Sequence, residues 1–367
     1  MNPADVEALR QRAASGDGDA QMALAYALDR EGRHDIALQW LQRAADGGHL
    51  PSLTMLGARL LTGRDAPQMP AQGAQMIAHA ADCGHAQACG FVAVLAAAGQ
   101  TRPQSWSTAL EYLFRGAQLG DPRARQQISL LVRDAGLAAR VMAPAGDTPW
   151  AAARADIDLA AWLRVEPGVK VSDWPRILVF RNFLPPAVCD WLVNLARPVL
   201  AAARANLPDV RDGAADPLRT NSGLGFTLLD SDVLMQIINA RTATASGAPA
   251  AYQEATNIEH YATGQEHKPH FDFLDPQAPH IVESVRRDGQ RVATFLVYLN
   301  GGFEGGETAF PLLDFRFKGQ PGDAILFLNV DAQGVIDPRT MHAGLPPTQG
   351  EKWLLAKRIR DRPVPQF

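Results

Sequence analysis

A repeat of fixed period constrains what the first third of this chain can fold into. Three segments, 37–49, 73–85 and 109–121, share one pattern of small and large apolar residues. Gly48 and Gly84 lie 36 residues apart, as do Gly84 and Gly120, and a degenerate earlier copy surrounds Gly18. A fixed period in this range is typical of stacked helical pairs. Because one pair cannot bury its own apolar face, the copies are expected to stack into an α-solenoid.

Each copy carries the features of two closely packed helices. Small residues such as Ala37 and Ala44 allow close approach, and Leu38 and Leu41 fill the gaps at helical spacing. This pattern resembles the SEL-like repeats, relatives of the tetratricopeptide repeat. The resemblance implies a concave surface for a protein partner. The alternative is an array that only supports the rest of the chain.

Length and composition limit the number of domains, the kinds of partner and the location that are expected. A length of 367 residues favours two domains. A net charge of −4 gives no reason to expect nucleic acid as a partner. No apolar run approaches the roughly 18 residues of a membrane span, and the N-terminus lacks a signal-peptide pattern. The three cysteines form no disulfide framework, so a reducing, cytoplasmic location is expected.

The sequence pattern changes from helical to β-type in the second half of the chain. Short β-type runs at 177–180, 291–299, 324–328 and 353–356 are separated by turn residues, which predicts a sandwich or jelly roll. Helical stretches near 187–203 and 231–244 are expected to flank it. We therefore predict a multidomain α and β protein: repeats over 1–135, a linker and connector helix over 136–174, and a second domain over 175–367.

A candidate metal site lies in this second domain. His270 and Asp272 fall in a β-prone stretch, where residues two apart project from the same face. His342, 70 residues after Asp272, is the candidate third ligand. Two histidines and one carboxylate with open positions are diagnostic of non-haem iron(II) oxygenases. On these residues alone, a surface histidine beside a surface aspartate is the alternative.

A lysine at a fixed distance from His342 adds to this hypothesis. Lys352, ten residues further on, could meet the distal carboxylate of 2-oxoglutarate in a charge-assisted pair. The alternative is a strand-edge lysine in water.

An ordered set of motifs resembles the catalytic domain of the prolyl 4-hydroxylase family. They occupy 261–265, 269–272, 291–294, 298–300, 305–311, 342–344 and 350–353. The resemblance runs from about Pro175 to Arg360. It implies a double-stranded β-helix, iron(II), 2-oxoglutarate, dioxygen and often ascorbate.

The resemblance also implies roles for individual residues. The implied iron ligands are His270, Asp272 and His342, and the implied 2-oxoglutarate contacts are Lys352 and the hydroxyls of Tyr261 and Thr308. Arg291 matches a position near the substrate. Without the family, Tyr261 would be a half-buried strand aromatic, Thr308 a turn residue and Arg291 a strand-start arginine in solvent.

Two positions depart from the family. His267 stands where tyrosine is common and is kept as a tentative substrate residue, and Arg358 stands where tryptophan is frequent. We interpret both as lying outside the metal and co-substrate set, so they weaken only the expectation of a proline substrate. Among the other histidines, His260 is expected in a strand and His280 in a loop.

The expected function is hydroxylation of a C–H bond in a peptidyl residue, proline being one candidate, with release of succinate and carbon dioxide. The presence of Asp272 favours hydroxylation over halogenation. Hydroxylation of a free amino acid or other small molecule is an alternative. A protein-binding scaffold with an inactive oxygenase domain is another, against which the full ligand set argues. The repeats favour a protein or peptide partner, recruited by the array.

Overall fold

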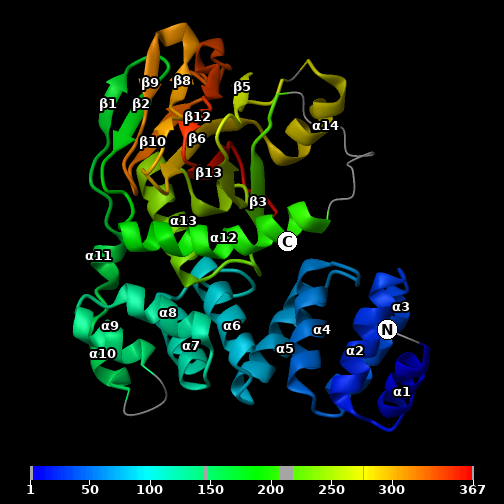
Figure 1. Ribbon diagram of the computed structural model, residues 1–367. Coiled ribbons are helices and arrows are strands. Elements are labelled where there is room, and N and C mark those ends of the chain that lie inside the picture. Colours follow the sequence, from blue (N-terminus) through cyan, green and yellow to red (C-terminus); the bar gives the residue numbers. More distant parts are fainter. Residues whose placement is uncertain (1–2, 144–147, 207–217, 276, 366–367) are drawn as a thin grey trace. The chain divides into compact units, whose positions relative to one another are not determined.

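The computed structural model describes residues 3–143, 148–206, 218–275 and 277–365, which form two compact units (Figure 1). One unit contains the described residues up to Trp162 together with Leu228–Ile237. The other contains the described residues of 163–227 and those from Ile238 onward. Among the described residues, no helix combines the length and apolarity that crossing a membrane requires.

The first unit is an array of helices in which each packs on the next, as the repeat predicts. Gly48, Gly84 and Gly120 all adopt positive φ after the first helix of a pair, a conformation that glycine takes at little cost. The helices are α1 (Pro3–Ala14), α2 (Gly18–Arg30), α3 (His34–Asp46), α4 (Leu50–Thr62), α5 (Pro70–Asp82), α6 (Ala86–Ala98), α7 (Trp106–Gln118), α8 (Pro122–Leu131), α9 (Ala135–Met142) and α10 (Trp150–Asp156).

Polar contacts between neighbouring pairs reinforce this stacking. The Arg59 guanidinium pairs with Asp29, 30 residues earlier, and both are largely buried. The Tyr112 hydroxyl donates to Asp82 Oδ1 at 2.9 Å, across the same interval of 30 residues. These contacts tie together helices that are separated by about one repeat along the chain.

A segment from the second half of the chain completes the first unit. Leu228 joins the buried apolar cluster that includes Ile77, Cys89 and Val92. The Val233 amide donates to Gln127 Oε1 at 3.0 Å. The sequence assigned this segment to the second domain, because nothing in its composition shows that it returns to the array.

The second unit is built on two main antiparallel sheets. The seven-stranded sheet has the order β1-β2-β10-β6-β13-β4-β3, and the four-stranded sheet has the order β5-β11-β8-β9. A small sheet pairs β12 with β7. The strands are β1 (Val169–Ser172), β2 (Ile177–Phe180), β3 (Ser222–Phe226), β4 (Thr256–Tyr261), β5 (His267–His270), β6 (Arg291–Tyr298), β7 (Glu304–Gly305), β8 (Thr308–Phe310), β9 (Phe315–Phe317), β10 (Ala324–Leu328), β11 (His342–Gly344), β12 (Pro347–Gln349) and β13 (Lys352–Arg360).

The two main sheets share one buried core. From β4 onward the chain passes repeatedly between the two main sheets: β4, β6, β10 and β13 lie in one, and β5, β8, β9 and β11 lie in the other. Leu296 and Leu354 of the larger sheet share a buried cluster with Phe310 and Phe317 of the smaller one. The predicted helical-repeat array and the β domain with flanking helices are thus confirmed.

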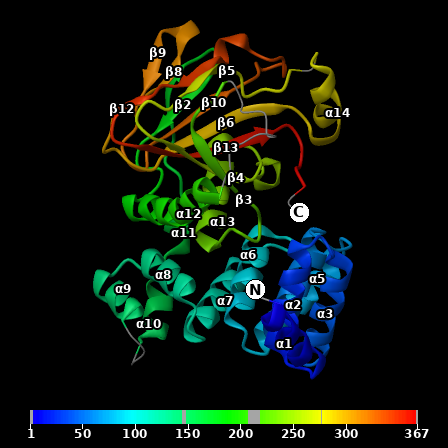
Figure 2. The same ribbon diagram turned by 45° about the vertical axis from the view of Figure 1, so that its right-hand side comes forward.

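Helices flank the sheets as expected, with some differences in detail. Helix α12 (Pro186–Asn206) packs on β3 and β4 (Figure 2), and α13 (Val233–Ser246) matches the second predicted helical stretch. His280 lies in α14 (Pro279–Asp288) and not in a loop, so that prediction is wrong. Three short 3-10 helices cover Ala250–Tyr252, Pro311–Leu313 and Pro338–Thr340.

The range 136–174 is more structured than a linker with one connector helix. It contains most of α9, then α10 and α11 (Leu159–Leu163), which are two short helices where the sequence predicts one. It also contains β1, which pairs with β2. The larger sheet therefore begins before Pro175.

Candidate active site

The structure brings together the three residues predicted to bind a metal. His270 ends β5, Asp272 follows two residues later, and His342 begins β11 directly opposite His270. One potential ligand atom from each lies within 4.8 Å of the others. His270 Nε2 is 3.8 Å from Asp272 Oδ1, and His342 Nε2 is 3.5 Å from Asp272 Oδ2.

Backbone carbonyls orient both imidazole rings. His270 Nδ1 lies 2.8 Å from the Lys268 carbonyl oxygen, and His342 Nδ1 lies 3.0 Å from that of Thr340. With the proton on Nδ1, each Nε2 presents a lone pair toward Asp272. Among the described residues, His270 Nε2 is buried and has no hydrogen-bond partner. Two oriented lone pairs beside a buried carboxylate suit a divalent cation.

The charge state of the cluster also suits a metal. Burial lowers the pKa of His342 to about 4, so the imidazole is neutral at neutral pH. Burial by itself raises the pKa of Asp272, but the Arg358 cation outweighs that effect and holds the pKa well below its usual value. His342 therefore presents a neutral nitrogen and Asp272 a carboxylate.

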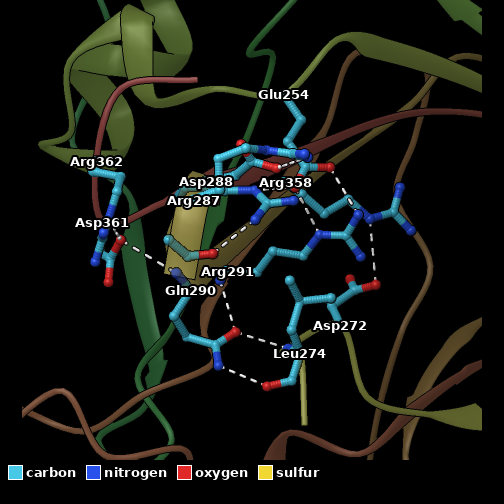
Figure 3. A network of polar contacts seen from close by, with 12 residues as sticks. Glu254, Asp272, Leu274, Arg287, Asp288, Gln290, Arg291, Arg358, Asp361 and Arg362 are labelled. Carbon is cyan, nitrogen blue, oxygen red and sulfur yellow. Dashed lines mark hydrogen bonds and ion pairs between the residues drawn. The ribbon is translucent and has the colours of Figure 1, made fainter. Parts of the chain in front are cut away.

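Asp272 is held on both of its oxygens. Arg358 Nε donates to Oδ1 at 3.3 Å (Figure 3). The Thr294 hydroxyl donates to Oδ2 at 2.7 Å. Arg358 Nη1 also donates to Glu259 Oε1 at 3.3 Å. A buried arginine thus joins the candidate metal ligand to a second buried carboxylate.

The interpretation that His267 and Arg358 lie outside the metal set is therefore wrong. Arg358 contacts Asp272 directly. The His267 ring stacks on His270 with centroids 3.5 Å apart and planes 15° apart. Both departures from the family pattern border the candidate ligands, because β13 and β5 carry them toward the same interior.

Lys352 is fully buried at the start of β13. Its Nζ donates to the Gly306 carbonyl oxygen at 3.0 Å and lies 4.1 Å from the centre of the Tyr261 ring. Burial lowers its pKa to about 8, partly offset by Glu259 and Glu307 at longer range. The alternative of a strand-edge lysine in water is wrong.

The two predicted hydroxyl contacts are also buried. The Tyr261 hydroxyl donates to Glu259 Oε2 at 2.9 Å, so Tyr261 is not a half-buried strand aromatic. Thr308 Oγ1 lies 2.9 Å from the Tyr298 hydroxyl, which donates to the Phe317 carbonyl oxygen at 2.8 Å. Thr308 belongs to β8, so the turn alternative is wrong as well.

Arg291 belongs to a separate ion-pair group. Its guanidinium makes two contacts of 2.8 Å with the Glu254 carboxylate, which also pairs with Arg360 (Figure 3). It is therefore not an arginine free in solvent.

The sequence analysis assigned no role to Glu259, Thr294 or Asn329, and it named Arg358 only as a departure from the family. Asn329 Nδ2 donates to Thr294 Oγ1 at 3.2 Å and so supports the contact to Asp272. A signal existed for Glu259, because residues two apart on a strand share a face and Tyr261 was already a candidate.

Comparisons with known proteins agree with this geometry. Residues 256–360 match the family model of the 2OG-Fe(II) oxygenase superfamily. The chain is 35% identical over 221 residues to prolyl 4-hydroxylase 1 of Arabidopsis thaliana, covering 56% of this chain and 76% of that protein.

Solved structures resemble each part of the chain. A viral collagen prolyl hydroxylase from Paramecium Bursaria Chlorella virus-1, in complex with 2OG, is 26% identical, with 50% of this chain and 95% of that chain covered and a TM-score of 0.37. A Sel1 repeat protein from Oxalobacter formigenes is 25% identical, with 37% and 52% covered and a TM-score of 0.30.

The identity to the plant enzyme extends over three quarters of its length, and the matched family model spans the strands that carry His270, Asp272, His342 and Lys352. The chain therefore belongs to the prolyl 4-hydroxylase family of iron(II)- and 2-oxoglutarate-dependent oxygenases.

Proposed function

We propose that this protein hydroxylates a residue of a polypeptide chain, using iron(II), 2-oxoglutarate and dioxygen and releasing succinate and carbon dioxide. The observation that carries the proposal is the cluster of His270, Asp272 and His342, with both Nε2 atoms turned toward the carboxylate. Its buried position in the β domain, with Lys352 in the same unit, supports an oxygenase site.

In this proposal His270, Asp272 and His342 hold the iron. The carbonyl contacts to both Nδ1 atoms fix the tautomers that a metal requires. When bound, iron(II) and 2-oxoglutarate supply the oxidation chemistry. The role of the protein is to orient the target bond and exclude water, and the burial of Asp272 and His342 suits the second task.

Lys352 takes the distal carboxylate of 2-oxoglutarate. Among the described residues, no carboxylate forms an ion pair with Lys352, although its side chain is fully buried. A buried ammonium without a counter-charge is costly, so a dicarboxylate that supplies one would bind favourably. Thr308 and Tyr261 are proposed as further contacts. Because the Tyr261 hydroxyl already donates its hydrogen bond to Glu259, Lys352 has the leading role.

The relatives named as prolyl 4-hydroxylases support a peptidyl proline as the target. The helical array offers an extended surface that would raise the concentration of a bound polypeptide near the site. Ascorbate is proposed as the reductant that keeps the iron ferrous, and the cytoplasm as the location.

The test is a turnover assay on polypeptides. Purified protein with iron(II), ascorbate and 2-oxoglutarate is incubated with a proline-rich peptide or with a dialysed cell extract, and His342→Ala serves as the control. We expect succinate to rise with added polypeptide, and one oxygen atom to appear on peptide fragments by mass spectrometry.

Two results would contradict the proposal. Equal succinate release by wild type and His342→Ala would refute the oxygenase site. Products confined to the small molecules of an undialysed extract would refute the polypeptide target.

A further inference from the structure

Asp272 is placed where its own strand cannot orient it. Strand β5 ends at His270, so Asp272 lies in the turn that follows and outside the ladder of β5 with β11. A carboxylate in such a position normally samples several rotamers. Its side chain is nevertheless buried and held at both oxygens.

The two groups that hold Asp272 come from adjacent residues of the larger sheet. Thr294 of β6 and Arg358 of β13 are direct cross-strand partners, so their side chains project from the same face. Thr294 reaches Oδ2 and Arg358 reaches Oδ1. The plane of the carboxylate is thus defined by a rigid part of the fold.

We propose that Arg358 and Glu259 form a positioning pair that sets the Asp272 carboxylate for metal binding. The inference rests on the proposed function, since it takes Asp272 as an iron ligand. Arg358 makes the contact with Asp272, and Glu259 holds Arg358 from its other side at 3.3 Å. Neither residue touches the iron in this assignment.

The partnership with Glu259 answers an electrostatic objection. A lone guanidinium beside Asp272 would neutralise a ligand and repel a dication. Glu259 is buried, and although burial alone raises its pKa, the Arg358 cation holds that pKa below its usual value. The pair is therefore neutral overall and orients Asp272 without adding net charge to the site.

A second buried ion pair on the same strand provides a matched control. Arg360, two residues after Arg358, contacts Glu254 at 2.6 Å and is similarly buried. Its guanidinium also donates to the Gly289 carbonyl oxygen at 2.7 Å. A purely structural role for Arg358 predicts that removing either pair has the same consequences.

The test compares two charge-balanced double variants of the full chain, Arg358→Met/Glu259→Gln and Arg360→Met/Glu254→Gln. Mn(II) replaces iron as a redox-stable probe, and its binding is followed by electron paramagnetic resonance beside a denaturant measurement of stability. We expect the first variant to lose about 10- to 100-fold in Mn(II) affinity, the usual effect of removing a group that orients a ligand. We expect the control to lose stability and keep its affinity.

Three results would overturn the inference: an unchanged affinity in Arg358→Met/Glu259→Gln, an equal loss in both double variants, or tighter Mn(II) binding by the single variant Arg358→Met. The last would mean that the charge of Arg358 matters and its geometry does not. If the double variant does not fold, Arg358→Lys replaces it, because one ammonium cannot bridge two carboxylates as a guanidinium does. Weaker Mn(II) binding by Arg358→Lys would support the inference, and wild-type affinity would overturn it. Asp272→Ala tests the proposed metal site separately from the positioning pair, because wild-type Mn(II) affinity in that variant would refute the metal site itself.

Discussion

Two lysines of β13 show how burial alone does not identify a functional residue. Lys352 and Lys357 are both buried, yet their ammonium groups differ in what they contact. Lys357 Nζ donates to the Glu254 carbonyl oxygen at 2.9 Å and to Thr256 Oγ1 at 3.1 Å. Lys352 Nζ donates to the Gly306 carbonyl oxygen, which leaves donor capacity for a ligand.

This difference predicts the effect of Lys352→Ala. Removing one partner of a desolvated charge pair should cost about 2–4 kcal/mol, or roughly 30- to 1000-fold in affinity for 2-oxoglutarate. Metal binding should persist, because Lys352 contacts none of the three proposed ligands in the described contacts. Calorimetric titration with 2-oxoglutarate on the Mn(II) form measures the change, and Lys357→Met is the control. An unaltered 2-oxoglutarate affinity would rule out the assigned role.

Lys357 predicts a pH dependence of stability. Burial lowers its pKa from 10.5 to about 7. Between these values the unfolded chain holds a proton that the folded chain lacks, so this group makes stability rise with pH across that window. The slope is at most about 1.4 kcal/mol per pH unit.

Lys357→Met removes this contribution. The free energy of unfolding of the wild type should therefore rise relative to that of the variant as pH increases from 7 to 9. Denaturant titrations of both proteins at each pH provide the comparison. Parallel stability curves would show that Lys357 stays protonated in the folded protein.

The sequence could predict the residues of the site that belong to a motif and not those that depend on a distant partner. His270, Asp272, His342 and Lys352 are recognisable by type and spacing. Arg358 and Glu259 are separated by 99 residues, and a charged residue in a strand does not reveal its partner. Their pairing follows from the meeting of β13 and β4, which only the fold specifies.

At the scale of elements, the crossing of α4 and α5 depends on a glycine. Position 73 is equivalent to Ala37 and Ala109 in the repeat, but a Cβ on Gly73 would lie 2.4 Å from the Gly57 carbonyl oxygen and 2.5 Å from the Leu61 nitrogen. The periodic pattern predicted small residues here. It could not distinguish glycine from alanine, because the distance between the two helices is set by packing along the whole array.

Gly73→Ala should therefore destabilise the protein by about 1–3 kcal/mol, the usual cost of overpacking. Gly90 in α6 is the matched control, since a Cβ there meets nothing within 4 Å. Gly90→Ala should raise stability by up to about 1 kcal/mol, because alanine loses less backbone entropy in a helix. Thermal unfolding of both variants checks the prediction, and a shift in the same direction for the two would contradict it.

At the scale of the whole molecule, the chain does not divide at one point. Leu228–Ile237 belongs to the unit of the helical array, although it is flanked on both sides by residues of the oxygenase unit. Composition and motifs change once along the sequence and so suggest one boundary. A single change in composition cannot reveal a short segment that belongs to the helical array but lies within the sequence of the other unit.

A fragment covering residues 163–367 should therefore aggregate when expressed alone, because Leu228 and Leu229 lose the apolar cluster that they pack on. Co-expression with residues 1–162 should restore a soluble complex. Size-exclusion chromatography of both preparations is the measurement. A monodisperse fragment without its partner would show that this segment does not need the array.

The strand order of the two sheets has a consequence for how the site opens. Strand β13, which carries Lys352, is hydrogen-bonded on both sides, by β4 and β6. Strand β5, which carries His270, is at the edge of its sheet. Amide protons of β13 should therefore exchange with deuterated solvent only on global unfolding, and those of β5 by local fraying. If the three proposed ligands hold a metal, a chelator should then extract it while Lys352 is still in place, at a rate set by the fraying of one short strand.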